Sequence, residues 1–522
     1  MTDAGAEVAP IRVLQSLGGE QEEGVVSAGR RVVRDPEVPH PGVGKPEHAG
    51  QPFTPRRVFT PRTTVGQTPP AVRMDPTAQA APAGRNSPTV VAAATPASAA
   101  GRTISASRER PRTLAAMSER QFDVVIFGAT GFVGRLVAEH LAAQGVGDVR
   151  IALAGRSAGK LARLQQTLGV SWPVLIAESA DQESIDVLAR STRVVISTVG
   201  PYGPRGLPLV LACARAGTSY ADLTGEALFV RQSIDQAHDL AVSTGARIVH
   251  ACGFDSVPSD LGMQVLAEQV LRDGEGELAE ATLLVVSIKG GVSGGTIDSM
   301  RVMVDDVRND PSLARRLGDP YLLSPDRGAE PDLGRQPDAF FVEQLPDGTW
   351  VAPFVMAGFN TRIVRRSNAL QGYAYGRELR YREAVRTGTS LLAPVTAGGI
   401  ALLTGALATG LRTPVVRPLL DKVLPDPGEG PSEKTWRNGH FRLEIRARSV
   451  TGARYVATVA APGDPGYGAT RVMLGQSALS LATDRLPDRA GVLTPATAMN
   501  GALTDRLRRN GFTFDVRRSG DA

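Results

Sequence analysis

The chain has 522 residues, of which 42% are apolar, so it is long enough for roughly two to four domains with a substantial core. Its formal net charge is only +5, and it has no dense lysine and arginine run with interleaved aromatic residues, which argues against nucleic acid as a partner. Two cysteines, Cys213 and Cys252, are too few for a disulfide framework, and the N-terminus lacks a signal-peptide pattern, so we expect a cytoplasmic protein.

Residues 1–117 differ from the rest of the chain. Proline, alanine, threonine, arginine and glycine dominate this segment, and it shows no long apolar periodicity. Such a segment cannot bury enough surface to offset its ordering entropy, so we predict a disordered extension. We interpret Met117 as the natural start of translation; the alternative is that the extension is a genuine disordered tail.

From residue 122 onward, short apolar runs alternate with segments of helical spacing. The runs that predict strands are residues 123–127, 149–154, 173–177, 193–197 and 247–250, and the segments that predict helices are residues 135–141, 158–168, 182–189, 206–216 and 228–244. Strands and helices that alternate at this spacing form a doubly wound parallel sheet with helices on both faces. We therefore predict an α/β Rossmann domain over residues 118–256.

The pattern changes after residue 257. Longer strands are predicted at residues 281–288 and 361–366, and residues 441–450 and 455–460 read as an antiparallel pair around the turn at Thr451. This predicts an α+β substrate and catalytic domain over residues 257–485. Residues 486–522 are expected to pack back on the Rossmann domain.

Residues 387–411 contain no charged side chain. These 25 residues exceed the roughly 20 that cross a bilayer, but Pro394 and several small residues make the segment only modestly apolar. Three interpretations stay open: a buried or lid helix pair, peripheral contact with a membrane, and a true membrane span.

A glycine-rich loop joins the first predicted strand to the first predicted helix. Gly128 allows the tight turn, Gly131 lets the backbone approach a pyrophosphate, and Gly134 lets the helix pack close to the sheet. The free N–H groups and the positive end of the helix dipole would then face the anion. The predicted phosphate-binding residues are Gly128, Ala129, Thr130, Gly131, Phe132, Val133 and Gly134.

The end of the second strand distinguishes between nicotinamide cofactors. NAD enzymes usually place a carboxylate there for the ribose 2′-hydroxyl, whereas this strand ends in Arg156 and Ser157. Arginine pairs well with a 2′-phosphate, and serine can donate to it, so the sequence favours NADP(H). After the fourth strand, Gly200 and Pro201 would place bare backbone near the nicotinamide ribose.

Five sequence blocks together resemble the saccharopine dehydrogenase-like oxidoreductases, and most closely their trans-acting enoyl reductases from mycobacteria. The blocks are residues 127–134 (FGATGFVG), 154–156 (AGR), 199–203 (VGPYG), 220–226 (YADLTGE) and 250–262 (HACGFDSVPSDLG). The resemblance implies a Rossmann domain joined to an α+β domain, with NADPH as hydride donor. For the closest subfamily it implies reduction of a carbon–carbon double bond in a polyketide-derived chain during lipid biosynthesis. The first 116 residues have no counterpart in the family.

Three side chains near strand ends are the candidate catalytic residues: Tyr202, Tyr220 and Asp255. Reduction of an enoyl thioester needs stabilisation of the enolate oxygen and a proton for the α-carbon, and phenols or a carboxylic acid can supply these. Each has a structural alternative, since Tyr202 could simply pack and Asp255 could cap a helix. Asp222 and Glu226 form either a carboxylate pair or a solvated helix start. His250 and Cys252 lack further ligands, so no metal site is predicted.

The sequence leaves three functions to compare. The first is an NADPH-dependent enoyl reductase that acts on a lipid or polyketide chain, either free or carried on a synthase. The second is a saccharopine reductase-like enzyme acting on an imine or ketone, and the third is a non-catalytic NADP-binding protein at a membrane. The charge-free segment suits a lipidic substrate better than a zwitterionic one. Peripheral contact with the inner membrane stays open, and so does the formation of a homodimer.

Overall fold

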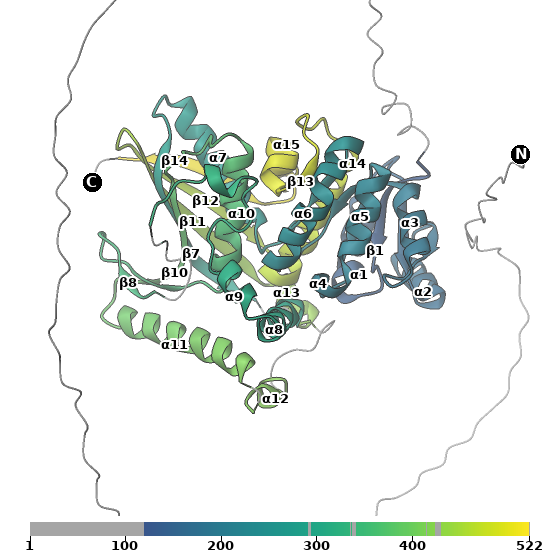
Figure 1. The fold of residues 1–522 in the computed structure, drawn as a ribbon, viewed down its shortest axis with the longest axis horizontal. Coiled ribbons are helices and arrows are strands. Elements are labelled where there is room, and N and C mark those ends of the chain that lie inside the picture. Colours follow the sequence, from purple (N-terminus) through teal and green to yellow (C-terminus); the bar gives the residue numbers. More distant parts are fainter. Residues whose placement is uncertain are drawn as a thin grey trace, which may run out of the picture. The chain divides into compact units, whose positions relative to one another are not determined.

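The computed structural model describes residues 120–290, 294–334, 336, 341–413, 415–422 and 430–520 (Figure 1). The extension predicted at residues 1–117, including Met117, lies outside the described residues. The described residues belong to one compact unit that holds two sheets. The domain boundaries at residues 256 and 485 therefore stay a prediction about how the chain is organised.

The first sheet is parallel and has the strand order β13-β6-β5-β4-β1-β2-β3. Its strands are β1 (Phe122–Phe127), β2 (Ile151–Gly155), β3 (Val174–Ile176), β4 (Thr192–Ser197), β5 (Ser219–Ala221), β6 (Arg247–Val249) and β13 (Gly491–Leu493). The helices that follow these strands are α1 (Phe132–Gln144), α2 (Ala158–Leu168), α3 (Gln182–Ser191), α4 (Tyr202–Arg205), α5 (Leu207–Ala216), α6 (Ala227–Thr244) and α7 (Val257–Arg272). The predicted doubly wound Rossmann sheet is confirmed.

Both faces of the first sheet are apolar, as buried parallel strands require. Every residue of β1 is buried, and alternate side chains of this strand enter two different cores. Val125 packs with side chains of α3, α5 and α6, whereas Val124 faces α1 and α14 (Thr470–Thr483). The sheet is therefore the middle layer between helices, and the carboxyl ends of its central strands share one edge.

The second sheet is mixed and has the order β14-β12-β11-β7-β10-β9-β8. Its strands are β7 (Leu278–Lys289), β8 (Glu343–Gln344), β9 (Trp350–Pro353), β10 (Arg380–Gly388), β11 (His440–Ser449), β12 (Arg454–Pro462) and β14 (Thr513–Ser519). The predicted antiparallel pair is confirmed as β11 and β12, whereas β7 and β10 run parallel. Helices of this half are α8 (Gly294–Asn309), α9 (Ser312–Leu317), α10 (Ala357–Leu370), α11 (Ala393–Arg412), α12 (Arg417–Leu420), α13 (Glu433–Arg437) and α15 (Pro495–Arg509).

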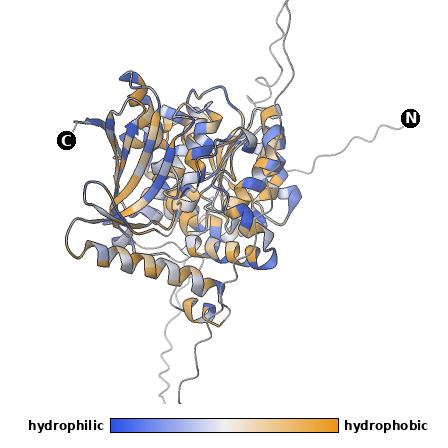
Figure 2. Cartoon of the chain, turned by 60° about the vertical axis from the view of Figure 1, so that its left-hand side comes forward, coloured by the Kyte–Doolittle hydropathy of each residue, from blue (hydrophilic) through white to orange (hydrophobic). Residues whose placement is uncertain are grey.

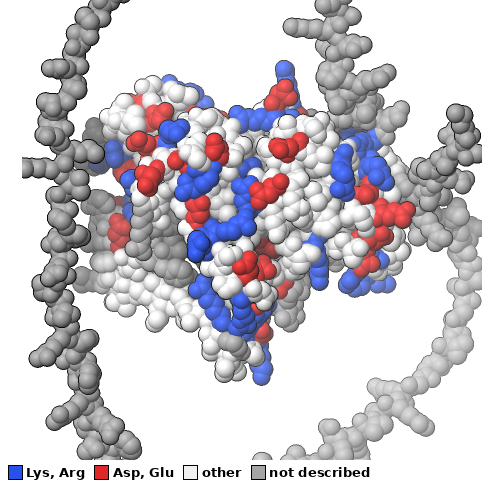
Figure 3. Space-filling model, viewed as in Figure 1, with Lys and Arg blue, Asp and Glu red and all other residues white. Residues whose placement is uncertain are grey.

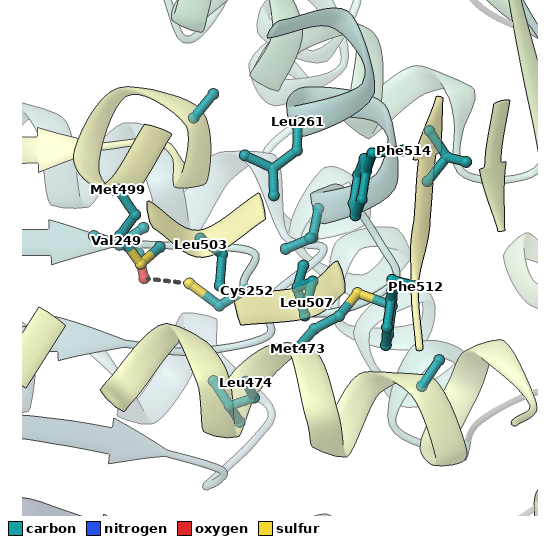
Figure 4. Close-up of a cluster of buried hydrophobic side chains, with 14 of the residues drawn as sticks. Val249, Cys252, Leu261, Met473, Leu474, Met499, Leu503, Leu507, Phe512 and Phe514 are labelled. Atoms are coloured by element: carbon teal, nitrogen blue, oxygen red, sulfur yellow. Dashed lines mark hydrogen bonds between the residues drawn. The ribbon is translucent and has the colours of Figure 1, made fainter. Parts of the chain in front are cut away.

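One hydrophobic core joins the two sheets, with α7, α14 and α15 contributing to it (Figure 4). Leu261 of α7, Met473 of α14 and Leu503 of α15 meet there with Phe514 of β14. Cys252 lies in the same core with its Sγ 3.6 Å from the Val249 carbonyl oxygen, and both Cys213 and Cys252 are free thiols. C-terminal residues belong to both sheets, since β13 pairs with β6 and β14 pairs with β12.

The strand predicted at residues 361–366 is wrong, because these residues lie within α10. Isoleucine and valine in this run favour a strand by propensity, but tertiary contacts override that preference. Arg362, Arg365 and Arg366 lie on one face of the helix, at spacings of three and four residues. Their guanidinium groups donate to backbone carbonyls of Asp319, Pro320 and Leu323 respectively.

The charge-free segment forms a single helix, α11, in place of a buried helix pair. This helix is long and apolar enough to cross a membrane by length and composition, yet only 17% of its most apolar stretch is buried. It lies beside β9 and β10 and carries apolar and small residues along its length (Figure 2).

Candidate active site

A cavity of about 1250 Å³ lies beyond the carboxyl ends of the first sheet's strands, where α/β proteins usually bind ligands. Its walls come from both halves of the unit: the loops after β1, β2, β3 and β4, and residues of α8, α10 and the turn before α14. Its volume exceeds the several hundred Å³ that a typical ligand needs, so a dinucleotide and a second molecule can share it.

The glycine loop has the geometry of a phosphate cradle. Gly128 has φ +85°, a conformation that other residues rarely adopt, and its N–H donates to the Ala154 carbonyl at 3.0 Å. A Cβ on Gly134 would lie 2.8 Å from Thr198 Oγ1 and closer still to the Gly128 carbonyl oxygen. The absence of a side chain at Gly134 therefore sets how closely α1 approaches β1.

The first turn of α1 leaves its N–H groups available to an anion. Its N-cap, Gly131, supplies no side-chain hydrogen bond, and no acidic residue lies in that turn. By contrast, α2 and α3 are capped by the side chains of Ser157 and Asp181. An uncapped helix start beside a cavity, with a glycine approach, fits a pyrophosphate.

Most of the predicted cofactor-binding residues line the cavity, but three do not. The lining residues are Gly128, Thr130, Gly131, Phe132, Val133, Arg156, Gly200 and Pro201. Ala129 is buried, Gly134 packs against the loop, and the Ser157 hydroxyl accepts from the Lys160 N–H as the cap of α2. Arg156 is exposed at the end of β2, where a 2′-phosphate would be bound.

Tyr202 lines the cavity as the first residue of α4, but its hydroxyl already has an acceptor. It donates to the Ser197 carbonyl at 3.0 Å, and its ring stacks on Phe229 at 5.8 Å between centroids. Burial raises the pKa of Tyr202 well above its usual range, so the phenol stays neutral. Proton donation by Tyr202 to a substrate would require release of the Ser197 bond.

Glu226 holds the start of α4, a role that the sequence did not reveal. Its two carboxylate oxygens accept from the N–H groups of Tyr202 at 2.9 Å and Gly203 at 2.7 Å. The Ser299 hydroxyl on α8 donates to the same carboxylate at 2.9 Å. Glu226 thus connects the loop beside the nicotinamide region to a cavity wall from the second half of the chain. Burial raises its pKa, although these hydrogen bonds act in the opposite direction.

Tyr220, Asp222 and His250 lie outside the cavity, behind the sheet edge. Tyr220 is fully buried, and its ring packs edge-on against the His250 ring. Asp222 contacts His250 Nδ1 at 2.8 Å, and His250 Nε2 contacts the buried Ser233 hydroxyl at 2.8 Å. Asp222 and Glu226 are both buried, so the alternative of a solvated helix start is wrong. This hydrogen-bonded series braces β5, β6 and α6, and Tyr220 could touch a substrate only by moving.

Asp255 is a carboxyl group that lines the cavity and has a raised pKa. It lies in the loop before α7, where Ser256 and not Asp255 occupies the N-cap position. Asp255 lines the cavity and is partly exposed there. Burial, and secondarily the Asp222 carboxylate, raises the pKa of Asp255 to about 7. A carboxyl group with this pKa is protonated about half the time at neutral pH and can act as a general acid.

Part of the cavity wall from the second half of the chain is apolar, beside the polar side chains of Asp298, Ser299 and Arg362. Its apolar side chains come from the end of β7, from α8, and from the β9–α10 segment: Ile288, Met300, Met303, Phe354, Met356 and Phe359. Methionine and phenylalanine adapt to irregular apolar shapes, so this wall suits a hydrocarbon chain better than a charged molecule.

The chain is similar to known NADP-binding oxidoreductases. The family model for the saccharopine dehydrogenase NADP binding domain matches residues 124–249. A Mycobacterium tuberculosis protein named as a candidate trans-acting enoyl reductase is 50% identical over 418 residues, covering 76% of this chain and 98% of that protein. Trans-acting enoyl reductases of Mycobacterium bovis and Mycobacterium ulcerans are 46% and 45% identical, each over 77% of this chain and 99% of their own length. The solved saccharopine dehydrogenase of Saccharomyces cerevisiae superposes with a TM-score of 0.48 at 13% identity, over 76% of this chain and 100% of its own.

Proposed function

The chain belongs to the trans-acting enoyl reductases of the saccharopine dehydrogenase-like family, and we propose that it reduces a carbon–carbon double bond in a lipid or polyketide chain carried by a synthase. It is an NADPH-dependent oxidoreductase, and NADP(H) is the cofactor of its Rossmann domain. The substrate class rests on the cluster of apolar side chains that α8 and the β9–α10 segment contribute to the cavity.

In this reaction the chain's own residues bind the cofactor and supply a proton. The bound NADPH supplies a hydride for the β-carbon. We assign the phosphates to the loop at Gly128–Gly134 and the start of α1, and the 2′-phosphate to Arg156, while Ser157 caps α2 beside it. Gly200 and Pro201 offer backbone to the nicotinamide ribose. Asp255 donates the proton to the α-carbon, because it is the cavity-lining candidate whose pKa suits a general acid.

Steady-state NADPH oxidation with matched acceptors tests this proposal. We expect turnover with a long-chain trans-2-enoyl thioester, and little with an imine or a ketone of the same chain length. Preference for the imine or ketone would replace the enoyl assignment by the saccharopine reductase alternative. Tight NADPH binding without turnover of any acceptor would instead indicate a non-catalytic NADP-binding protein. Lipid profiling of a deletion strain should show accumulation of unsaturated analogues.

Reversing the charge at Arg156 should change cofactor preference. The Arg156→Glu variant loses a charge-assisted contact and adds repulsion, and contacts of this kind contribute about 1.5–3 kcal/mol. We therefore expect NADPH binding to weaken by roughly 10- to 100-fold, with NADH binding unchanged or improved. Fluorescence titration of both nucleotides measures this. Unchanged NADPH affinity would show that Arg156 does not contact the 2′-phosphate.

Removing the Ser299 hydroxyl should affect the substrate more than the cofactor. Ser299→Ala deletes only the bond from α8 to Glu226 and leaves the two N–H bonds to that carboxylate in place. One such bond contributes about 0.5–1.5 kcal/mol, so the KM for the enoyl substrate should rise about 2- to 10-fold while the Kd for NADPH stays constant. An equal loss of NADPH affinity would show that Ser299 supports the nucleotide loop and not the substrate wall.

The proposed site of action is the cytoplasm at the inner face of the membrane. The buried free thiols suit a reducing compartment. A synthase partner would present the chain to the cavity, and α11 would contact the membrane periphery. A homodimer stays a prediction that no feature of the described residues favours.

A further inference from the structure

The helices α11 and α12 present a large exposed apolar surface. Large aliphatic side chains of these helices and the residues beside them have 63–97% of their surface exposed: Leu391, Leu392, Val395, Leu402, Leu403, Val415 and Leu419. We call this set the α11–α12 face. Single exposed aliphatic residues are ordinary, but a contiguous set on one surface marks a site of interaction.

The buried residues of α11 lie on one side of the helix, and its large exposed side chains lie on the other. Ala393, Ala397 and Leu411 are buried on one side of the helix, which packs against β9, β10, α8 and α12. Val395, Leu402 and Leu403 recur at helical spacing on the other side and face outward. An ordinary surface helix places charged residues there, whereas residues 387–411 have none.

The chemistry of the α11–α12 face favours a lipid surface over a protein. The large exposed side chains of α11 and α12 are aliphatic, and neither helix contains the tryptophan or tyrosine that often anchors a protein interface at its centre. Where α11 meets α12 and α8, Arg301 and Arg417 pair with Asp421 and Asp305, whereas Arg308, Arg412 and Lys422 have no ion pair among the described residues, so these cations border the apolar area. Figure 3 shows an uncharged surface over α11, and toward α12 it shows lysine or arginine side chains with some aspartate or glutamate among them. An apolar stripe with cations at its edge suits anionic lipid headgroups and the acyl region beneath them.

We propose that the α11–α12 face binds an anionic lipid surface, with α11 lying parallel to it. A membrane span is disfavoured, because both ends of the helix are packed against the rest of the unit, at Ala393 and Ala397 and again at Leu411. The outward stripe would enter the boundary between headgroups and acyl chains, and the cations would remain at headgroup level.

This placement connects the lipid surface to the cavity, and that consequence rests on the proposed function. The ion pairs Arg417–Asp305 and Arg301–Asp421 join α12 to α8, a helix that lines the cavity. Arg412 at the end of α11 lines the same cavity, and Arg308 of α8 donates to its carbonyl at 3.2 Å. An acyl chain at the lipid surface would therefore lie beside the cavity wall formed by Met300 and Met303.

Vesicle flotation of the full chain tests the proposal, with phosphatidylglycerol–phosphatidylcholine vesicles as probe and pure phosphatidylcholine vesicles for comparison. The test variant is Leu402→Asp with Leu403→Asp, at residues that are 76% and 73% exposed. The matched control is Leu271→Asp, because Leu271 is 67% exposed on α7 and outside the face. We expect the wild type and the control to float with the anionic vesicles. The double variant should bind at least about 100-fold more weakly, since it loses two leucines that would enter the lipid.

The result that overturns the proposal is equal flotation of the double variant and the wild type, or no flotation of either. Loss of a dimer in the double variant, seen by light scattering without vesicles, would assign the face to a second copy and also overturn it. If the wild type binds a purified synthase but not vesicles, and the double variant loses that binding, the face contacts the synthase and the proposal is overturned. NADPH oxidation with a short, water-soluble enoyl thioester should be the same in all three proteins. Failure of the reductase assay would therefore not be mistaken for failure of the lipid contact.

Discussion

Replacing Gly134 with alanine should reduce NADPH affinity by about 100-fold or more. The new Cβ would lie 2.8 Å from Thr198 Oγ1 and nearer still to the Gly128 carbonyl oxygen, which is backbone and cannot rotate away. Relief of this overlap requires α1 to move from β1, and overpacking of this kind costs about 1–3 kcal/mol. The same movement displaces the N–H groups of the first turn from the pyrophosphate, so binding is lost in addition to stability. Isothermal titration with NADPH measures the loss.

The matched control for this variant is Gly159→Ala. Gly159 lies in α2, and a Cβ there would meet nothing within 4 Å. Alanine in an exposed helix is favoured over glycine by about 0.5–1 kcal/mol, so this variant should be slightly more stable and bind NADPH normally. Circular dichroism establishes that the Gly134 variant is folded at the titration temperature. NADPH affinity within about threefold of the wild type in the folded Gly134→Ala protein would contradict the assigned role of the loop.

The nucleotide half of the fold could be predicted because its signals are local. The first strand, the glycine loop and α1 are adjacent in the sequence, and each identifies the next through apolar runs and helical spacing. Arg156 follows from the same argument, since it directly ends the second strand. The positions of Gly128, Gly131 and Arg156 at one cavity therefore agree with the sequence argument.

The rest of the site depends on contacts between distant residues. Ser299 and Glu226 are 73 positions apart, and no spacing rule relates a hydroxyl on α8 to a carboxylate before α6. The sequence also gave no sign that Asp222 and Glu226 are buried, because a carboxylate near a helix start is usually solvated. The helix at residues 361–366 was missed for the same reason: its arginines are stabilised by carbonyls that the sequence places some 40 positions earlier.

The exposed helix α11 shows the limit of composition as evidence. A charge-free segment predicts burial, a membrane span or surface contact equally well, because each environment accepts apolar side chains. Only the packing of one side of α11 against the second sheet, with Leu402 and Leu403 outward, separates these alternatives. Composition therefore identified the segment, and the tertiary structure shows which of its side chains are exposed.

Replacing Asp255 with asparagine should lower kcat by roughly 100-fold while the Kd for NADPH changes little. General acid catalysis contributes about 10²–10⁴-fold, and asparagine keeps the shape of the side chain but cannot donate a proton of comparable acidity. In the wild type the donor must be protonated, so kcat should be constant below pH 7 and fall about tenfold per pH unit above it. The variant should show a low rate without that decline. Single-turnover NADPH oxidation between pH 5.5 and 9 measures both.

The pH dependence of the free energy of unfolding distinguishes a catalytic role of Asp255 from misfolding of the variant. Because the pKa of Asp255 is about 7 in the folded protein and 3.8 is its ordinary value, the folded state binds the proton more tightly than the unfolded state between these values. The free energy of unfolding attributable to this group therefore falls as pH rises from about 4 to 7 and stays low above 7. Asp255→Asn should consequently be more stable than the wild type at pH 8 and about equal at pH 4.

The control is Asp298→Asn, another cavity carboxyl, which should retain both the rate and its decline above pH 7. A decline above pH 7 that persists in Asp255→Asn would assign the proton to another group, and a less stable variant at pH 8 would attribute the lost activity to misfolding.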